Sequence, residues 1–309
     1  MKLILLMKKY LDEIRFAVKD RTFIGYNGIA NLYVNTKLCD IDLKRLSNEK
    51  LNKIFKNRFC EEETLSIATI KLIKNQINRC LSFGREKKLI PLLKIDIPLK
   101  MPNKKIQCLR DDKILKIENY LINNKKVYSF GILISLLTGL RIGELLSLKW
   151  QDVDFEKNIL NIRSTASDIV FEHKLLHLEN EPKTESSIRQ IPITKELKFL
   201  LNSLKSFQKN KSKYVVSREN GKRIQIRSYQ ESWNRLLKKL DIKHYGFHSL
   251  RHTFATRCNR FGMDIKTLSE LLGHSNPSIT LKTYVHSNLD MKREALLKVN
   301  KKIRHNLPD

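Results

Sequence analysis

The chain has 309 residues, of which 41% are hydrophobic, and this length is sufficient for two domains with sizeable cores. Its 60 lysines and arginines against 32 acidic residues give a formal net charge of +28, which favours a polyanion as partner. No apolar stretch approaches the length of a membrane span, and the run before Lys8 is too short for a signal peptide, so we exclude a membrane partner and expect a cytoplasmic protein.

Both parts of the chain contribute to the positive charge. Residues 1–105 hold 23 basic and 11 acidic side chains, and residues 106–309 hold 37 and 21. A lysine-rich solvated surface explains the charge equally well when the charge is taken alone. The five cysteines form no Cys-x-x-Cys pair and no zinc-like spacing, which is typical of a reducing compartment.

The first hundred residues carry the periodicity of amphipathic helices. Apolar residues recur at intervals of three and four, at Leu51, Ile54 and Phe55 and then at Ile67, Ile70, Ile73, Ile77 and Leu81. Gly25-Tyr26-Asn27-Gly28 is interpreted as a turn, because it lacks the lysine and hydroxyl residue of a phosphate loop. We predict a small helical bundle over residues 1–102.

Three prolines mark the end of this bundle. Pro91, Pro98 and Pro102 lie close together, and each lacks an amide donor and restricts the residue before it. This stretch is therefore predicted to be an extended connector, with the domain boundary after residue 102 and a second domain over residues 103–309.

The second domain is predicted to combine helices with a small sheet. Residues 127–137 form an almost unbroken apolar helix, and Gly139 suits the left-handed position that follows a helix. Short strands are predicted at residues 152–155, 159–162 and 188–193 from their β-branched and alternating residues. The predicted fold class is mostly α with a small antiparallel β-sheet.

Four motifs of the second domain follow one another in a characteristic order. They are Thr138-Gly139-Leu140-Arg141-Ile142-Gly143-Glu144, His248-Ser249-Leu250-Arg251-His252, Leu271-Leu272-Gly273-His274 and a lone Tyr284. Together they resemble the active site of the tyrosine recombinase (phage integrase) family, over residues 107–285. The resemblance implies a site-specific recombinase that cleaves and rejoins DNA through a covalent 3′-phosphotyrosyl intermediate, without metal, ATP or another cofactor. It also implies that the N-terminal bundle is a SAM-like domain that binds the core site.

The residues of these motifs supply the parts that the chemistry needs. Cleavage of a phosphodiester without a metal requires a nucleophile, cations for the non-bridging oxygens and an acid for the leaving oxygen. Arg141 and Arg251 offer planar forks of donors that match a phosphate. His248 lies three positions before Arg251, on one face of a helix predicted to begin near Ser249, and either donates to the same phosphate or helps to deprotonate Tyr284.

Tyr284 is the predicted nucleophile, because its interval from His274 matches the pattern of the resembling family, and two arginines and two histidines nearby would favour its phenolate. Gly273 is predicted to end a helix that begins near Asp264, which holds His274 rigidly, and Pro277 opens the helix that carries Tyr284. Tyr284 taken alone would more often be a half-buried aromatic residue.

Two further residues are assigned supporting roles. Lys183, on the loop between the second and third predicted strands, is the candidate general acid for the leaving 5′ oxygen, and Lys174 and Lys195 lie nearby as alternatives. Glu144 is predicted to orient Arg141, although a surface ion pair would have the same spacing. His252 is predicted to be structural.

No metal site is predicted. His173 and His177 are spaced as zinc ligands on a helix would be, but no third ligand is evident, and we interpret this segment as a solvated loop.

The resemblance also implies partners. The expected substrate is double-stranded DNA with inverted core sites, and an accessory DNA-bending or directionality factor is a further candidate partner. An amphipathic tail helix is predicted from Leu289, Met291, Leu296, Leu297 and Val299. In family members such a tail docks on a neighbouring subunit and links a homotetramer on paired sites, whereas packing on its own domain is the alternative.

Several functional alternatives stay open at this point. The preferred interpretation is the integrase of a phage or another mobile element. A Xer-type chromosome-dimer resolvase is the first alternative, because no additional N-terminal DNA-binding domain is evident before residue 50. A type IB topoisomerase would use much the same residues without paired sites, and a catalytically silent DNA-binding regulator would also be basic.

Overall fold

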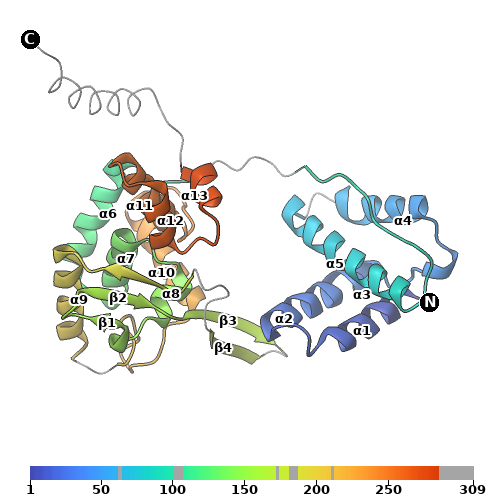
Figure 1. Ribbon diagram of the computed structural model, residues 1–309, viewed down its shortest axis with the longest axis horizontal. Coiled ribbons are helices and arrows are strands. Elements are labelled where there is room, and N and C mark those ends of the chain that lie inside the picture. The colour runs from blue at the N-terminus through green and yellow to red at the C-terminus, as the bar shows by residue number, and fades with distance from the viewer. Residues whose placement is uncertain (62–64, 101–106, 172–173, 181–186, 210–211, 285–309) are drawn as a thin grey trace, which may run out of the picture. The chain divides into compact units, whose positions relative to one another are not determined.

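The chain divides into two compact units, Met1–Lys104 and Lys105–Asp309, two residues after the boundary predicted from the prolines. The structure, a computed structural model, describes residues 1–61, 65–100, 107–171, 174–180, 187–209 and 212–284. Within these ranges the first unit is helical, and the second combines helices with short strands (Figure 1). None of the helices described is both long and apolar enough for a membrane span.

The first unit is a helical bundle, as its periodicity predicts. Its elements are α1 (Leu3–Ile14), α2 (Asp20–Ile29), η1 (Ala30–Val34), α3 (Asn35–Lys37), η2 (Leu43–Arg45), α4 (Asn48–Phe55), η3 (Lys56–Cys60) and α5 (Ile67–Glu86). The apolar stripe of α5 faces the core, where Ile73, Ile77 and Leu81 are fully buried. Ser47 and Ser66 cap α4 and α5 through their hydroxyl groups, which explains where these two helices begin.

Two local predictions in this unit need correction. The turn predicted at residues 25–28 is wrong, because these residues continue α2, and the side chain of Gln76 donates to the carbonyl of Tyr26 at 2.6 Å. Packing against α5 here outweighs the low helix propensity of two glycines. The proline-rich stretch is extended as expected, but it is part of the first unit rather than a bare connector: Ile95 is 1% exposed, and Asn78 holds its N–H and C=O at 2.8 and 2.9 Å.

The second unit contains the remaining elements. They are α6 (Asp111–Asn123), α7 (Val127–Thr138), α8 (Ile142–Ser147), η4 (Trp150–Asp152), β1 (Val153–Asp154), β2 (Ile159–Ile162), β3 (Thr165–Phe171), β4 (Lys174–Asn180), β5 (Arg189–Pro192), α9 (Lys195–Gln208), α10 (Ile226–Lys239), α11 (Ser249–Arg260), α12 (Ile265–Leu272) and α13 (Pro277–Tyr284). The apolar helix α7 packs against α9 and α11 in the core, and Gly139 follows it in the left-handed conformation, with φ of 66°.

The strands form two separate antiparallel sheets. One has the order β1-β2-β5 and contains the three strands that the sequence predicts, with Leu160 opposite Val153 on one side and Ile191 on the other. The second is the hairpin β3–β4, in which Asp168 lies opposite His177. The sequence did not predict this hairpin, so residues 165–171 and 174–180 of the predicted loop between the second and third strands are in fact two further strands.

Candidate active site

Arg141 and Glu144 meet at the start of α8. Arg141 is the residue before the first turn of the helix, and its backbone N–H donates to Glu144 Oε2 at 2.9 Å. Its guanidinium donates to Glu144 Oε1 at 2.7 Å. This is the reciprocal arrangement of a helix capping box, extended by an ion pair. The carboxylate thus fixes both the backbone and the side chain of Arg141, as the spacing of the two residues suggested.

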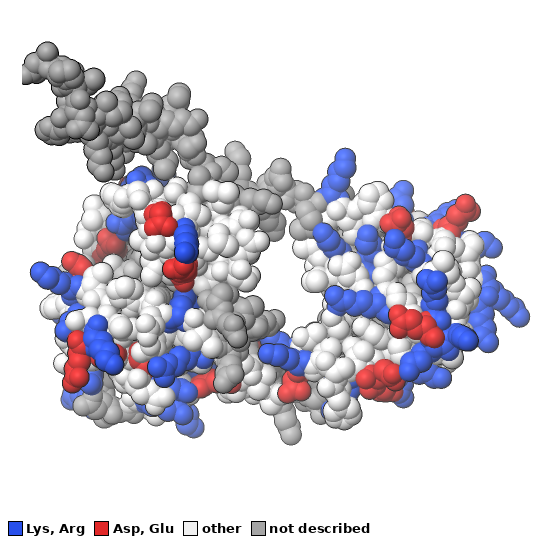
Figure 2. Space-filling view, in the orientation of Figure 1, with Lys and Arg blue, Asp and Glu red and all other residues white. Residues whose placement is uncertain are grey.

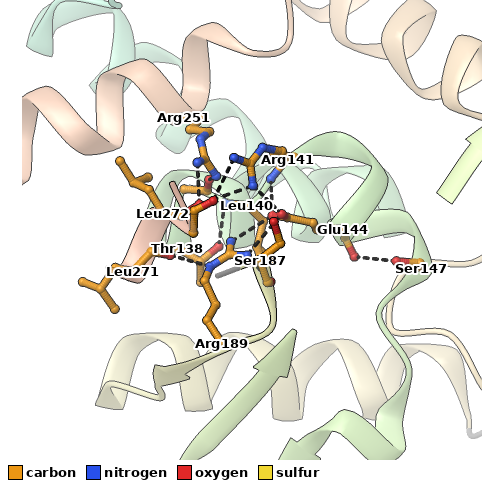
Figure 3. Close-up of polar contacts among 12 residues, drawn as sticks. Thr138, Leu140, Arg141, Glu144, Ser147, Ser187, Arg189, Arg251, Leu271 and Leu272 are labelled. Atoms are coloured by element: carbon orange, nitrogen blue, oxygen red, sulfur yellow. Dashed lines mark hydrogen bonds and ion pairs between the residues drawn. The ribbon is translucent and has the colours of Figure 1, made fainter. Parts of the chain in front are cut away.

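Glu144 is a buried carboxylate with a second arginine partner. Its side chain is 4% exposed, and both Nη atoms of Arg189 donate to its two oxygens, at 3.1 and 2.9 Å (Figure 3). Burial alone would raise the pKa of the Glu144 carboxyl, but the hydrogen bonds and charge of Arg189, with the charges of Arg141 and Arg251, lower it to about 2. Glu144 is therefore ionised at any physiological pH.

The three arginines also converge on the end of α12. The last carbonyls of a helix have no partner within it, and they carry the negative end of the helix dipole. Here the arginines supply the missing donors. Arg189 Nε donates to Leu271 O at 2.6 Å, and Arg141 Nη2 donates to Gly273 O at 3.2 Å. Leu272 O accepts from both Arg141 Nη1 and Arg251 Nη2, at 3.3 and 2.5 Å. Gly273 ends the helix in the left-handed conformation, with φ of 63°, as predicted.

Arg251 and His248 come from the start of α11. Arg251 is 1% exposed and also donates to Gly139 O at 3.1 Å, so that it links the end of α7 to the end of α12. His248 immediately precedes the helix, and the His252 ring lies edge-on to it at 4.7 Å between centroids. Burial, the neighbouring His252 and the charges of Arg251 and Arg141 lower the pKa of His248 from 6.5 to about 4. His248 is thus neutral at pH 7.

His274 lies directly after the left-handed Gly273. Its Nδ1 is 2.8 Å from the hydroxyl of Thr280, a fully buried residue of α13. Burial and the charges of Arg251, Arg141 and Arg189, followed by His248, lower the pKa of His274 to about 4. Three arginines against one carboxylate leave this cluster with an excess of positive charge, which suits a bound anion.

The structure describes only some of the remaining residues that the sequence singles out. Asp264 caps α12 and Asn276 caps α13 by accepting from the N–H of Thr267 and Ser278, at 2.9 and 2.8 Å, in agreement with the predicted helix boundaries. Tyr284 is at the end of α13 as the structure describes it, and its side chain is outside that description. Lys183 and the predicted tail helix of residues 289–299 also lie outside the described residues.

Arg189 is the residue of this cluster that the sequence motifs missed. It was predicted only as part of an alternating strand, and β5 indeed buries Arg189 and Ile191 while it exposes the residues between and after them. That alternation contained the signal: an arginine on the buried face of a strand needs a buried carboxylate as partner.

His177 has a different environment from the loop that was predicted. It lies on β4, with Nδ1 2.9 Å from Asp168 Oδ1, and the same carboxylate accepts from Arg223 and from the N–H of Ile226, at 2.5 and 2.6 Å. These bonds fasten the hairpin to the start of α10. His173 is outside the described residues, and no group of three metal-binding side chains lies within the described part of the chain.

Comparison with known proteins gives one family match and several relatives. The model of the phage integrase family matches residues 107–291. A protein named tyrosine recombinase XerC-like, from Caldanaerobacter subterraneus subsp. tengcongensis, is 29% identical over 96% of this chain and 82% of its own length. The transposase from transposon Tn916 of Enterococcus faecalis is 31% identical over 55% of this chain, which spans less than half, 45%, of that relative.

The fold has solved counterparts. The Tn1549 transposon integrase, determined in complex with a circular intermediate DNA, aligns with a TM-score of 0.81 over 97% of this chain and 99% of that structure, at 23% identity. A lambda integrase dimer bound to a core site aligns with a TM-score of 0.71 over 94% of this chain, at 16% identity. At these identities the likeness concerns the fold of the chain.

Proposed function

The chain belongs to the phage integrase family of tyrosine recombinases, and we propose that Arg141, Lys183, His248, Arg251, His274 and Tyr284 catalyse its site-specific cleavage and rejoining of DNA. The observation that carries this proposal is the cluster of three arginines around one buried carboxylate at the end of α12. Burial, and after it the charges of these arginines, lower the pKa of both neighbouring histidines, and an anionic phosphate is the ligand that would balance the arginine charge.

The proposed reaction proceeds by two transesterifications. The Tyr284 hydroxyl oxygen attacks the scissile phosphorus, and the bond from phosphorus to the 5′ oxygen breaks, so that a 3′-phosphotyrosyl ester and a 5′-hydroxyl result. Lys183 protonates the leaving 5′ oxygen. A 5′-hydroxyl of the partner strand then attacks the phosphotyrosine, which re-forms a phosphodiester and frees Tyr284. One ester replaces another at each step, so no ATP is consumed.

The geometry assigns different parts to the two motif arginines. Arg141 is 35% exposed, and its contacts with Glu144, Leu272 and Gly273 leave the Nε–H and one Nη2–H without a partner in the described part of the chain. These two groups form the side-on edge of the guanidinium, which matches two phosphate oxygens. Arg251 is 1% exposed, so its contact with the phosphate requires a local movement of the residues that cover it.

His248 is suited to accept the tyrosine proton. A general base must be unprotonated at the working pH, and a pKa of about 4 keeps the imidazole neutral at pH 7. A bound phosphate would raise this pKa again, which strengthens the histidine as a base only once the substrate is present. His274, held by Thr280, is assigned to a non-bridging oxygen as a neutral hydrogen-bond donor.

We further propose that the enzyme integrates or excises a mobile element, with a Xer-type resolvase as the alternative. Both kinds of protein occur among the relatives. The substrate would be duplex DNA with inverted core sites, bound by the second unit together with the helical first unit, which would contact the core site. Four subunits would assemble on two paired sites through the tail that follows Tyr284, with an accessory DNA-bending or directionality factor as a further partner.

A two-site plasmid assay without divalent metal or ATP tests this function. The plasmid carries two copies of the DNA that flanks the gene, and a matched plasmid carries none. Recombined circles from the two-site plasmid alone are the expected result. Relaxation of both plasmids without recombination would instead indicate a type IB topoisomerase, and tight binding without any strand cleavage would leave a DNA-binding regulator.

A further inference from the structure

Arg189 has no role in the reaction proposed above, yet it is as closely connected to the site as the motif arginines. Resting on that proposed function, we infer that Arg189 is a positioning residue: it supplies the counter-charge for Glu144, so that the charge of Arg141 remains available for the scissile phosphate. Arg189 would thus act through Glu144 and Arg141 without touching the DNA.

The contacts of Arg189 place it beside the site rather than in it. Its side chain is 5% exposed, and its guanidinium donates from Nε to Leu271 O, from Nη1 to Ser187 O at 3.2 Å, and from both Nη atoms to Glu144 (Figure 3). These bonds use every nitrogen of the guanidinium. Four of its five N–H groups thus have protein partners, and the side chain is buried, so Arg189 is poorly placed to hold a phosphate as well.

The charges of the cluster explain why a second arginine is needed. If Glu144 faced Arg141 alone, the buried anion and the cation would neutralise each other, and a phosphate approaching Arg141 would be repelled by the carboxylate 2.7 Å from its guanidinium. With Arg189 paired end-on to Glu144, the carboxylate can still orient Arg141 by hydrogen bonds while its charge is cancelled from the other side.

Arg189 also connects three elements that carry the candidate residues. Through Glu144 it holds the start of α8, through Leu271 the end of α12, and it lies on β5 itself. His274 follows α12 after a single glycine. A change at Arg189 would therefore be transmitted to Arg141 and to His274.

Single-turnover cleavage of a nicked core-site duplex by the full chain tests this inference. Arg189→Met keeps an unbranched apolar stem and removes the charged guanidinium. We expect it to slow cleavage by about 100-fold, the upper range for residues that orient the groups in direct contact with a reacting centre. Core-site binding should stay within about threefold, because phosphate contacts elsewhere dominate affinity. Arg189→Lys retains the charge, and should cleave within about tenfold of the wild type.

The double variant Arg189→Met/Glu144→Gln gives the sharpest result. If Arg189 acts by cancelling the charge of Glu144, removal of that charge should make the double variant cleave at least about tenfold faster than Arg189→Met. The reason is that deletion of both partners of a buried pair costs less than deletion of one. A purely structural role of Arg189 would make the double variant no faster than the single one. Arg260→Met, which breaks the exposed pair with Asp111, is the matched control and should cleave at the wild-type rate.

The outcomes separate this inference from the proposed function. No cleavage by the wild type would contradict the function itself. With an active wild type, a normal rate for Arg189→Met, a lysine variant as slow as the methionine variant, or a folded double variant without recovery would each overturn the role of Arg189. Should Arg189→Met fail to fold, cleavage by the lysine and double variants supports the inference, and their failure to cleave or to fold refutes it.

Discussion

Glu144 is the anion around which the arginines of the site are arranged. It accepts from the backbone and side chain of Arg141 and from both Nη atoms of Arg189, so its oxygens are fully occupied. Because the carboxylate is only 4% exposed, solvent water cannot reach it to replace a lost donor. The same residue thus orients a proposed catalytic group and neutralises a buried one.

Replacing this carboxylate by an amide should therefore be costly. Glu144→Gln leaves two arginines without their counter-ion, and removal of one partner of a buried ion pair destabilises a protein by about 3 to 5 kcal/mol. Both tryptophans of the chain, Trp150 and Trp233, lie in the second unit, so urea unfolding followed by tryptophan fluorescence reports on that unit. Glu231→Gln, at an exposed pair with Arg227, is the control and should change stability by less than about 0.5 kcal/mol. An equally small effect of Glu144→Gln would contradict the assigned geometry.

The histidines should titrate far below their ordinary range. The pKa of both His248 and His274 is about 4 in the folded chain, against 6.5 for an ordinary histidine, so the unfolded state takes up protons first as the pH falls. Their contribution to stability is accordingly complete above pH 6.5 and is lost as the pH falls toward 4.

NMR titration of the ring protons, with His248→Gln and His274→Gln for assignment, measures these values directly. Addition of a core-site duplex should raise both, because a phosphate anion offsets the arginine charges. Values near 6.5 in the free protein, or no response to DNA, would show that the cluster does not act on these rings.

At the scale of residues, the order of the motifs singles out several side chains that the fold brings together. The motifs single out Arg141, Glu144, Arg251 and His274. Arg141 pairs with Glu144, and both Arg141 and Arg251 donate to the carbonyl at the end of α12. Together with burial, the charges of the two arginines lower the pKa of His274. Arg189 could not be found in this way, since its role depends on a carboxylate 45 residues away that only the fold brings beside it. Its burial was nevertheless implied by the alternation of β5.

At the scale of elements, the approach of α8 to β3 fixes where Arg141 points. Gly143 lies in the first turn of α8, and a Cβ built there would be 2.6 Å from the backbone oxygen of Ala166 and equally close to the hydroxyl of Thr165. Only glycine allows this contact, because a backbone oxygen inside a strand cannot move aside cheaply.

Gly143→Ala should consequently push α8 away from β3 and shift Arg141 with it. We expect a loss of about 1 to 3 kcal/mol in stability, the range for overpacking, and slower cleavage. Thermal unfolding and the nicked-duplex assay measure the two effects. Gly246→Ala, where a Cβ meets nothing within 4 Å, is the control in the same unit, and an alanine at residue 143 that behaves like this control would refute the close approach.

The elements that sequence predicted well are those with strong local signals. Helices α4, α5, α7, α12 and α13 follow from apolar spacing, hydroxyl, carboxylate or carboxamide caps and terminal glycines or prolines. The hairpin β3–β4 was missed because polar residues such as Asp168 and His177 occupy its strands. The bonds of Asp168 to Arg223, His177 and Ile226 and the packing of β3 on α8 hold it in place, and no local pattern records these contacts.

At the scale of the whole molecule, positive charge is the common property of the two units. Lysine and arginine side chains are spread over the surface of both units on the face shown in Figure 2. A core-site duplex held mainly through its phosphates releases counterions on binding, so the logarithm of the association constant falls linearly with that of the salt concentration. Because both units are basic, we expect both to contribute to the slope of this salt dependence.

Fluorescence anisotropy with a labelled core-site duplex measures this dependence. With about 6 to 10 phosphate contacts, affinity should fall by about 10³- to 10⁵-fold between roughly 50 and 200 mM salt. A chain truncated after residue 104 should bind with a smaller slope than the full chain. An affinity that is insensitive to salt would show that the charge of +28 belongs to a solvated surface without a role in binding.

Covalent attachment of DNA to Tyr284 is the most direct test of the proposed cleavage chemistry. A nicked duplex carrying the candidate core site is incubated with the protein without divalent metal. Cleavage releases the short fragment between the cleavage point and the nick, which carries the new 5′-hydroxyl, and its loss traps the adduct. Wild type should yield a protein–DNA adduct through a 3′ phosphate, whose peptide maps to Tyr284, and Tyr284→Phe should bind the duplex equally well and yield none. An adduct on another residue would contradict the assigned nucleophile, and tight binding without any adduct would contradict the enzyme.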